Sequence, residues 1–176
     1  MRAKMIFPCV LLLGATLCAA ARPAAQQKKD YLSEAEADKI RDAYATGPRI
    51  LLYAQFAADR IKKIKYELAH IDTADRHRTE RLNSLIVGYS GCIDDAADLV
   101  ELGTEKQEDI REGVKELQAQ IKEALPYLKD LAVNGIERET YKENLEDAIE
   151  ATQDAAKDVE KAVKEVAPPP VRRKPT

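Results

Sequence analysis

Apolar residues recur every three or four positions through most of this chain, which is the spacing of one face of an α-helix. Turn-forming residues interrupt the repeat at several places, so it predicts separate helices rather than one continuous rod. The expected fold class is all-α. The predicted helices lie at about 33–44, 48–71, 76–103, 104–134 and 137–166.

Each of the four long segments carries a continuous apolar seam with alternating spacings of four and three, the heptad pattern of helices that pack along their length. In the segment at 76–103 the seam widens to three positions in seven, which suits a globular bundle better than a two-stranded coiled coil. The predicted seams are Ile50, Ala54, Ala57, Ile61, Ile64, Leu68 and Ile71; Leu82, Leu85, Tyr89, Cys92, Ala96 and Leu99, widened by Ile86, Ile93 and Val100; Ile110, Val114, Leu117, Ile121, either Ala124 or Leu125, Leu128 and Leu131; and Tyr141, Leu145, Ala148, Thr152, Ala155, Val159, Ala162 and Val166.

Local signals predict where the first helices begin and end. Ser33 is followed three residues later by Glu36, which is the pattern of a capping box at a helix start. The Thr-Gly-Pro run at 46–48 ends the short helix, and its proline suits the first turn of the next one. The Asp-Thr-Ala-Asp run at 72–75 predicts a short connection with N-capping side chains.

Further signals predict the ends of the later helices. Gly103 is expected to close one helix, and Thr104 with Gln107 forms a second capping-box pattern for the next. Pro126 lies inside that helix and removes one backbone donor, so we expect a bend there. The Asn-Gly pair at 134–135 is a turn signal that ends it.

Short connections between long helices favour antiparallel neighbours, so the predicted architecture is an up-down-up-down antiparallel four-helix bundle with a short extra N-terminal helix. A three-helix bundle and an open helical array remain alternatives, because heptad spacing fixes the faces of helices and not their partners.

Leu52 and Phe56 form a second apolar patch on their helix, off the main seam. We expect Leu32, Ile40 and Tyr44 of the short helix to cover it. On a later helix, Gly88 and Gly91 have two interpretations: they let another backbone approach closely, or they only weaken the helix.

The first residues have the order of a cleavable export signal. Arg2 and Lys4 are followed by a mostly apolar run at 5–17 and by three alanines at 19–21. The run is shorter than the roughly 20 apolar residues of a membrane-spanning helix. The predicted organisation is a signal peptide at 1–25, a polar spacer at 26–31, the bundle domain at 32–167 and a disordered Pro-rich basic tail at 168–176.

Removal of this leader changes the composition of the chain. Cleavage of the leader also removes Arg2, Lys4 and Arg22. The remaining chain has 25 basic and 31 acidic residues, a net charge of −6. An acidic surface disfavours binding to nucleic acid and to anionic membranes. Charged residues at 34% with aromatic residues at 5% are typical of helical bundles and coiled coils. We therefore expect an exported protein, periplasmic or extracellular, with no integral membrane segment after cleavage.

Metal and cofactor chemistry finds little support. Glu67 and His70 have the Glu-x-x-His spacing of di-iron bundles, but such sites need a second pair, and His77 follows Ala74 where an acid would stand. A solvated helix face is the favoured interpretation, and no Cys-x-x-Cys-His run exists for covalent haem. We predict no metal ligands, no cofactor-binding residues and no cofactor.

Catalytic chemistry is equally unsupported. Cys92 is the only cysteine left after removal of the leader, so no internal disulfide forms. It occupies a seam position, where cysteine behaves as a small buried apolar residue rather than as a nucleophile. We predict no catalytic residues.

Two groups of charged residues remain. Asp94, Asp98 and Glu101 project from one helix face, either as a solvated surface or as a weak site for a divalent cation or a basic partner. The basic run at 60–65 is expected to pair with acids of a neighbouring helix rather than to contact a polyanion.

These observations favour a non-enzymatic, exported helical bundle that acts as an interaction or structural module in the cell envelope. Its partner is an unknown protein or a second copy of the chain. The alternative hypothesis is carriage of a lipid or another apolar ligand, with the bundle opening at Gly103 and at the Asn-Gly pair of 134–135.

Overall fold

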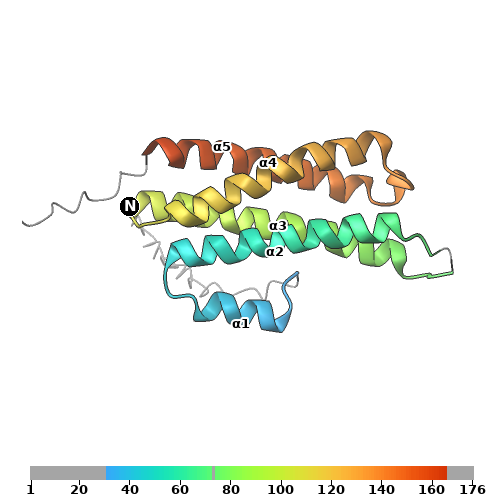
Figure 1. The fold of residues 1–176 in the computed structure, drawn as a ribbon, viewed down its shortest axis with the longest axis horizontal. Helices are drawn as coiled ribbons and strands as arrows, with labels where there is room; N and C mark the ends of the chain where they lie inside the picture. Colours follow the sequence, from blue (N-terminus) through green and yellow to red (C-terminus); the bar gives the residue numbers. More distant parts are fainter. Residues whose placement is uncertain (1–30, 73, 166–176) are drawn as a thin grey trace, which may run out of the picture.

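The computed structural model describes residues 31–72 and 74–165. Figure 1 shows four long helices side by side and a short helix outside them, which confirms the predicted fold class. The leader at 1–25 and the tail at 168–176 lie outside the described residues, as does all of the spacer except Tyr31. The elements are α1 (Glu34–Asp42), α2 (Thr46–Ala69), α3 (Arg78–Glu105), α4 (Arg111–Asn134), the 3₁₀ turn η1 (Arg138–Thr140) and α5 (Lys142–Glu165).

The long helices form two antiparallel hairpins, α2 with α3 and α4 with α5 (Figure 1). The hairpins pack so that α2 lies beside α4 and α3 lies beside α5. Chain direction alternates from helix to helix, so these two contacts bring together helices that run the same way. The connection from α3 to α4 therefore joins helices at opposite corners of the bundle, although it is short.

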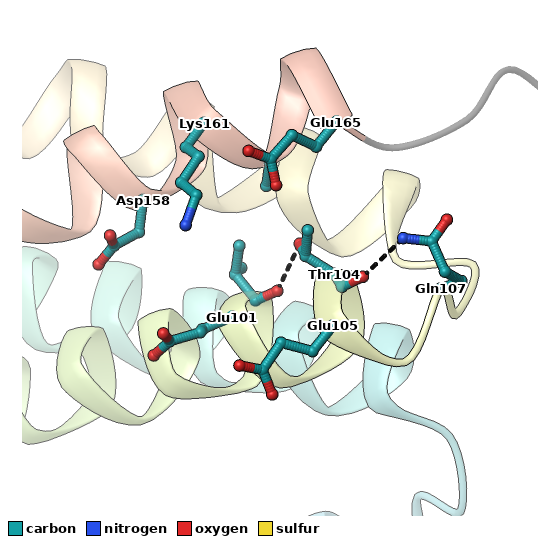
Figure 2. A pocket seen from close by; sticks show the side chains of 9 residues that line it. Glu101, Thr104, Glu105, Gln107, Asp158, Lys161 and Glu165 are labelled. Carbon is teal, nitrogen blue, oxygen red and sulfur yellow. Dashed lines mark hydrogen bonds between the residues drawn. The ribbon is translucent and has the colours of Figure 1, made fainter.

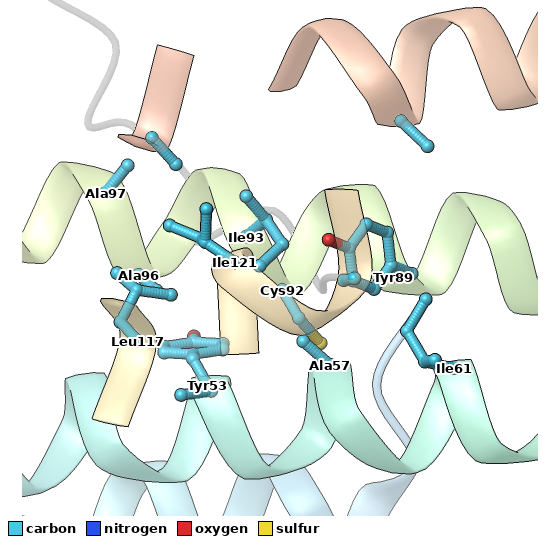
Figure 3. Close-up of a cluster of buried hydrophobic side chains, with 14 of the residues drawn as sticks. Tyr53, Ala57, Ile61, Tyr89, Cys92, Ile93, Ala96, Ala97, Leu117 and Ile121 are labelled. Carbon is cyan, nitrogen blue, oxygen red and sulfur yellow. The ribbon is translucent and has the colours of Figure 1, made fainter. Parts of the chain in front are cut away.

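The core fills the space between the four long helices. Figure 3 shows one part of it, where Tyr53 and Ala57 of α2 face Cys92 and Ala96 of α3, with Leu117 of α4 beside them. Nearly every predicted seam residue of the described helices is buried or packed against this core, which confirms the seam prediction. Ile71 is the exception, because α2 ends at Ala69 and leaves the Ile71 side chain 40% exposed.

Two glycines let α2 and α4 approach closely at one end of the bundle. A Cβ atom on Gly113 would lie 2.6 Å from the backbone oxygen of Gly47 and 2.8 Å from the Cβ of Ile50. Real carbon atoms do not come that close to a backbone oxygen, so only glycine fits at position 113. This contact holds α2 beside α4 despite the short connection between α3 and α4.

The predicted helix boundaries are partly confirmed. The capping box of Ser33 and Glu36 is present at the start of α1, and α4 ends at Asn134 with Gly135 as its C-cap. The prediction that Gly103 closes a helix and that Thr104 caps the next one is wrong, because α3 continues to Glu105 and α4 begins at Arg111. The Thr104 hydroxyl donates instead to the carbonyl of Val100, at 2.8 Å, as a threonine inside a helix does.

Within residues 31–72 and 74–165, no helix has the length and apolar character needed to cross a membrane.

Candidate functional site

An apolar groove lies between the C-terminal ends of α2 and α4. Leu68 and Ala69 come from α2, and Tyr127 and Leu131 from α4, while Ile136 of the following turn forms one wall. The groove has a volume of about 280 Å³ and is open to solvent. We call it the α2–α4 groove, and its full lining is Leu68, Ala69, Tyr127, Asp130, Leu131, Asn134, Gly135 and Ile136.

The turn that carries Ile136 is fixed by hydrogen bonds and not only by packing. The hydroxyl of Tyr141 donates to the backbone oxygen of Ile136 at 2.8 Å, and the ring of Tyr141 is buried. Glu137 then adopts a left-handed backbone with φ of 56°, a conformation that costs free energy for a residue other than glycine. The neighbouring contacts hold Ile136 at the edge of the groove in spite of this cost.

A buried arginine joins this turn to the α2–α3 connection. The Arg78 guanidinium forms an ion pair with the carboxylate of Glu137 and donates to the backbone oxygen of Glu67 at 3.4 Å. The Arg78 side chain is only 6% exposed. The C-terminal end of α2 and the turn after α4 are thereby held at a fixed separation, which sets the width of the groove.

The rim of the groove combines an aromatic ring with charge. The ammonium group of Lys65 lies 5.0 Å from the centre of the Tyr127 ring and 3.1 Å from a carboxylate oxygen of Glu123. Burial, and then the nearby groups of Tyr141 and Asp130, raise the pKa of Tyr127 to about 12, so its hydroxyl is neutral. Tyr127 is therefore a neutral, half-buried platform that a charged rim surrounds.

Exposed aliphatic side chains gather at this same end of the bundle. Ile136 is 55% exposed, and Val133 on the last turn of α4 is 68% exposed. Ile71, at the end of α2, is exposed as well. Neither Val133 nor Ile136 belongs to a predicted seam or site. Both are apolar residues outside the helical seams, and that was the signal that could have identified them.

A second, polar groove lies between the C-terminal ends of α3 and α5, with a volume of about 230 Å³. Figure 2 shows the carboxylates of Glu101, Glu105, Asp158 and Glu165 around its edge, with Lys161 among them. The carboxylates surround the groove without converging on one point, and no group of three or more ligating side chains able to hold a metal ion occurs among the described residues.

The predicted acidic surface of α3 lies next to this groove. Asp94, Asp98 and Glu101 are all exposed, as the helical spacing indicated. Partial burial, and then the neighbouring carboxylates of Asp98 and Asp154, raise the pKa of Asp94. The structure therefore shows an acidic face on which the carboxylates of Asp98 and Asp154 make ionisation of Asp94 less favourable.

The Glu-x-x-His pair is used for other contacts. Both carboxylate oxygens of Glu67 accept hydrogen bonds from Arg81, each at 2.9 Å. His70 is exposed and its ring stacks on that of Tyr66, with 4.2 Å between centroids. His77 lies beyond the α2–α3 turn beside Glu80. The two members of the pair thus face different neighbours.

Cys92 is fully buried in the core, as its seam position predicted. The basic run on α2 also behaves largely as expected. Arg60 pairs with Glu36 of α1, and Lys65 pairs with Glu123 of α4. Lys63 pairs within its own helix, with Asp59. Arg60, Lys63 and Lys65 of this run are therefore paired with acids of the chain itself.

No family model, curated protein or solved structure shows a significant match to this chain.

Proposed function

We propose that this protein is an exported, non-enzymatic interaction module of the cell envelope, and that it binds a protein partner through the α2–α4 groove. The observation that carries the proposal is the exposure of Ile136 in the lining of a groove, next to a turn that Arg78 ties down, with exposed Val133 on the last turn of α4. Exposed aliphatic side chains next to a preformed apolar hollow are a feature of protein-binding surfaces.

The size of the groove favours aliphatic side chains of a protein as its occupant. Its volume of about 280 Å³ falls below the roughly 300–1,000 Å³ of pockets that bury a small molecule. It is also open, so a ligand in it would keep much of its surface in water. A protein surface avoids that cost, because the rest of its interface covers the groove.

The charges around the groove support a partner of mixed polarity. Lys65 and Asp130 lie on its two sides. A polar rim of both signs around an apolar centre is the usual arrangement of a protein–protein contact.

Site-specific photocrosslinking in the producing cell tests the proposal. A photoreactive amino acid at Ile136 is expected to form discrete crosslinked species, and the same group at Val163 of α5, which is 53% exposed, serves as the matched control. Ala69→Lys places a charge in the groove lining and is expected to remove the Ile136 crosslinks. Identical products from both positions, or products that persist with Ala69→Lys, would contradict the proposal.

Export is tested separately, by fractionating the cells and sequencing the amino terminus of the recovered protein. We expect a chain that lacks the first residues, up to the alanines of 19–21 or to position 25, outside the cytoplasm. A chain that keeps Met1 and stays with the cytoplasmic fraction would overturn this part of the proposal.

Carriage of an apolar ligand is the competing hypothesis, and it requires the bundle to open. The apolar faces of all four long helices are already packed against one another. Titration with a fluorescent fatty acid separates the two hypotheses: saturable uptake at a fixed ratio supports carriage, and the proposed interaction module shows none.

A further inference from the structure

The segment from Tyr31 to Asp42 lies outside the four-helix core. Figure 1 shows α1 alongside α2 at the edge of the bundle, and α1 packs mainly against α2. No residue of α1 is fully buried. Leu32 and Ile40 pack against the core as predicted, but the prediction that Tyr44 helps to cover Phe56 is wrong, because Tyr44 is 97% exposed. The segment is thus held by a few specific contacts.

The first contact is an ion pair between Arg60 of α2 and Glu36 of α1. The guanidinium of Arg60 donates to both carboxylate oxygens of Glu36, in one case at 2.7 Å, and to the backbone oxygen of Tyr31 at 3.2 Å. The Arg60 side chain is 8% exposed and that of Glu36 is 16% exposed. The same carboxylate accepts hydrogen bonds from the backbone and hydroxyl groups of Ser33, each at 2.9 Å. Glu36 therefore has two roles: it caps α1, and it docks α1 against α2.

The second contact places an aromatic ring on a glycine of α3. A Cβ atom on Gly91 would lie 2.6 Å from a ring carbon of Tyr31. The Tyr31 hydroxyl donates to the carboxylate of Asp95 one turn further along α3. Gly88, one turn before, faces the Tyr31 backbone and the Arg60 side chain. At Gly91 the close neighbour is a side-chain ring and not the backbone that the sequence suggested, and at Gly88 the Tyr31 backbone oxygen would lie at an ordinary 3.7 Å from a Cβ atom. We call the surface formed by Arg60, Gly88, Gly91 and Asp95 the α1 shelf.

The shelf belongs to the bundle, whereas the carboxylate that Arg60 requires comes from a peripheral helix. A buried guanidinium that loses its anionic partner is strongly destabilising, because its charge is then neither hydrated nor paired. The shelf therefore favours an occupant that carries a carboxylate at the position of Glu36 and an aromatic ring at the position of Tyr31.

The connection between α1 and α2 consists of Ala43, Tyr44 and Ala45, and its backbone is already extended. Ala43 has φ of −78° and ψ of 105°, and Ala45 has φ of −103° and ψ of 152°. Two hydrogen bonds from Arg49 hold the connection to α2: its side chain donates to the backbone oxygen of Ala43 at 2.6 Å, and its backbone donates to that of Ala45 at 3.3 Å. Rotation at these three residues would carry α1 away from its own shelf without unfolding either helix.

We propose that α1 is exchanged between two copies of this chain, so that in a dimer Tyr31 and Glu36 of each copy occupy the α1 shelf of the other. The exchanged contacts are identical to those within one copy, so exchange makes and breaks the same interactions at the shelf. The short extended connection favours it, since such a connection spans to a neighbouring molecule as readily as it folds back. This inference does not rest on the proposed function, because it uses a different surface.

Mixing two charge-reversed chains tests the exchange. Glu36→Arg leaves a cation facing Arg60 within its own copy, and Arg60→Glu leaves two acids facing each other. Only exchange between the two variants pairs opposite charges at both shelves. We expect each variant alone to be monomeric by native mass spectrometry, and the mixture to form a 1:1 heterodimer. The amount of heterodimer in this mixture should exceed the amount in the control mixture by on the order of tenfold or more.

The control mixture replaces Glu36→Arg with Glu34→Arg, which reverses an exposed acid on the same turn of α1. A chain carrying both Glu36→Arg and Arg60→Glu restores the pair within every copy and should behave as the unsubstituted chain does. If the first mixture stays monomeric while the double variant folds, or if the Glu34→Arg mixture forms as much heterodimer as the first mixture does, the proposal is wrong.

A measurement on the unsubstituted chain covers the case in which Arg60→Glu fails to fold. Sedimentation at increasing concentration is expected to show a dimer that Glu36→Arg abolishes and Glu34→Arg keeps. A dimer that Glu36→Arg leaves unchanged, or a chain that is monomeric at its highest soluble concentration, would overturn the exchange.

Discussion

The hydroxyl groups of Tyr89 on α3 and Thr152 on α5 lie 2.9 Å apart in the middle of an otherwise apolar core. The Thr152 hydroxyl also lies 2.6 Å from the backbone oxygen of Ala148, to which it donates its single proton. The Tyr89 hydroxyl is therefore the donor of the hydrogen bond between the two helices. Burial raises the pKa of Tyr89, so this proton stays on its phenolic oxygen.

The direction of this hydrogen bond predicts unequal effects of removing each partner. Thr152→Val leaves the buried Tyr89 hydroxyl without an acceptor and should lower the free energy of unfolding by about 1–3 kcal/mol. Tyr89→Phe removes the donor and should cost about 0.5–1.5 kcal/mol. The double variant should cost less than the sum of the two, since no hydroxyl then remains unsatisfied. Urea denaturation measures all three, and strictly additive costs would show that the hydroxyls do not interact.

Acid should release α1 before it unfolds the bundle. The hydrogen bonds from Arg60, and then those from Ser33, lower the pKa of Glu36 from 4.5 to about 2 against the opposing effect of burial. Because the pKa is lower in the docked state, ionisation of Glu36 stabilises docking fully above pH 4.5, and this contribution is lost as pH falls towards 2.

Hydrogen exchange of the α1 amides measures this loss of docking. We expect their protection to fall between pH 4.5 and pH 2, after correction for the intrinsic pH dependence of exchange. In Glu36→Gln, protection should be low throughout and should not follow this titration. An unchanged pH profile in Glu36→Gln would mean that another group controls the docking of α1.

The two glycines of the α1 shelf should respond differently to alanine. Alanine in place of glycine inside a helix is worth about 0.5–1 kcal/mol. Gly91→Ala should stabilise α3 by this amount but displace the Tyr31 ring. The bundle should therefore become more stable, while the α1 amides become less protected against hydrogen exchange. At Gly88 the nearest atom to a new Cβ is the Arg60 Nε at 3.4 Å, an ordinary contact. Gly88→Ala should therefore stabilise the bundle and leave α1 protected. Equal protection of α1 in both variants would contradict the role given to Tyr31.

The sequence predicted the parts of this fold that depend on one helix at a time. The capping box of Ser33 and Glu36 and the buried seam follow from spacing along a single helix, and both are present. The pairing of α2 with α4 was not predictable in this way. It depends on contact between Gly47 and Gly113, which are far apart in the chain, and a heptad pattern does not say which faces meet.

The difference between patterns within one helix and contacts between helices also explains why the helix boundary at Thr104 was predicted wrongly and why the α2–α4 groove was not predicted. Thr104 and Gln107 match the capping pattern, but Gly103 packs against Ile110, and α3 continues past Gly103 and Thr104 to Glu105. Gln107 then takes a left-handed backbone in the connection. The turn beside the α2–α4 groove is tied by the ion pair of Arg78 and Glu137, which lie 59 residues apart, and neither stands out in the sequence. Local patterns indicate where a helix can end, and tertiary contacts decide where it does.

The ion pair of Arg78 and Glu137 yields the last prediction, which concerns the walls of the α2–α4 groove. Glu137→Gln leaves the buried guanidinium of Arg78 without its anion, so it should lower the free energy of unfolding by about 1–2 kcal/mol, a value reduced by the partial exposure of Glu137. Arg78→Met removes the buried cation and keeps an apolar stem of similar length, so it should cost less than Glu137→Gln does. Both variants should speed amide exchange in the turn at 135–141, because the tie to the α2–α3 connection is lost in each. Chemical denaturation ranks the two costs, and exchange at the turn reports the tie. If Arg78→Met proves the more damaging variant, the stem and the hydrogen bond to the Glu67 backbone hold the groove in shape, and the charge of Glu137 contributes little.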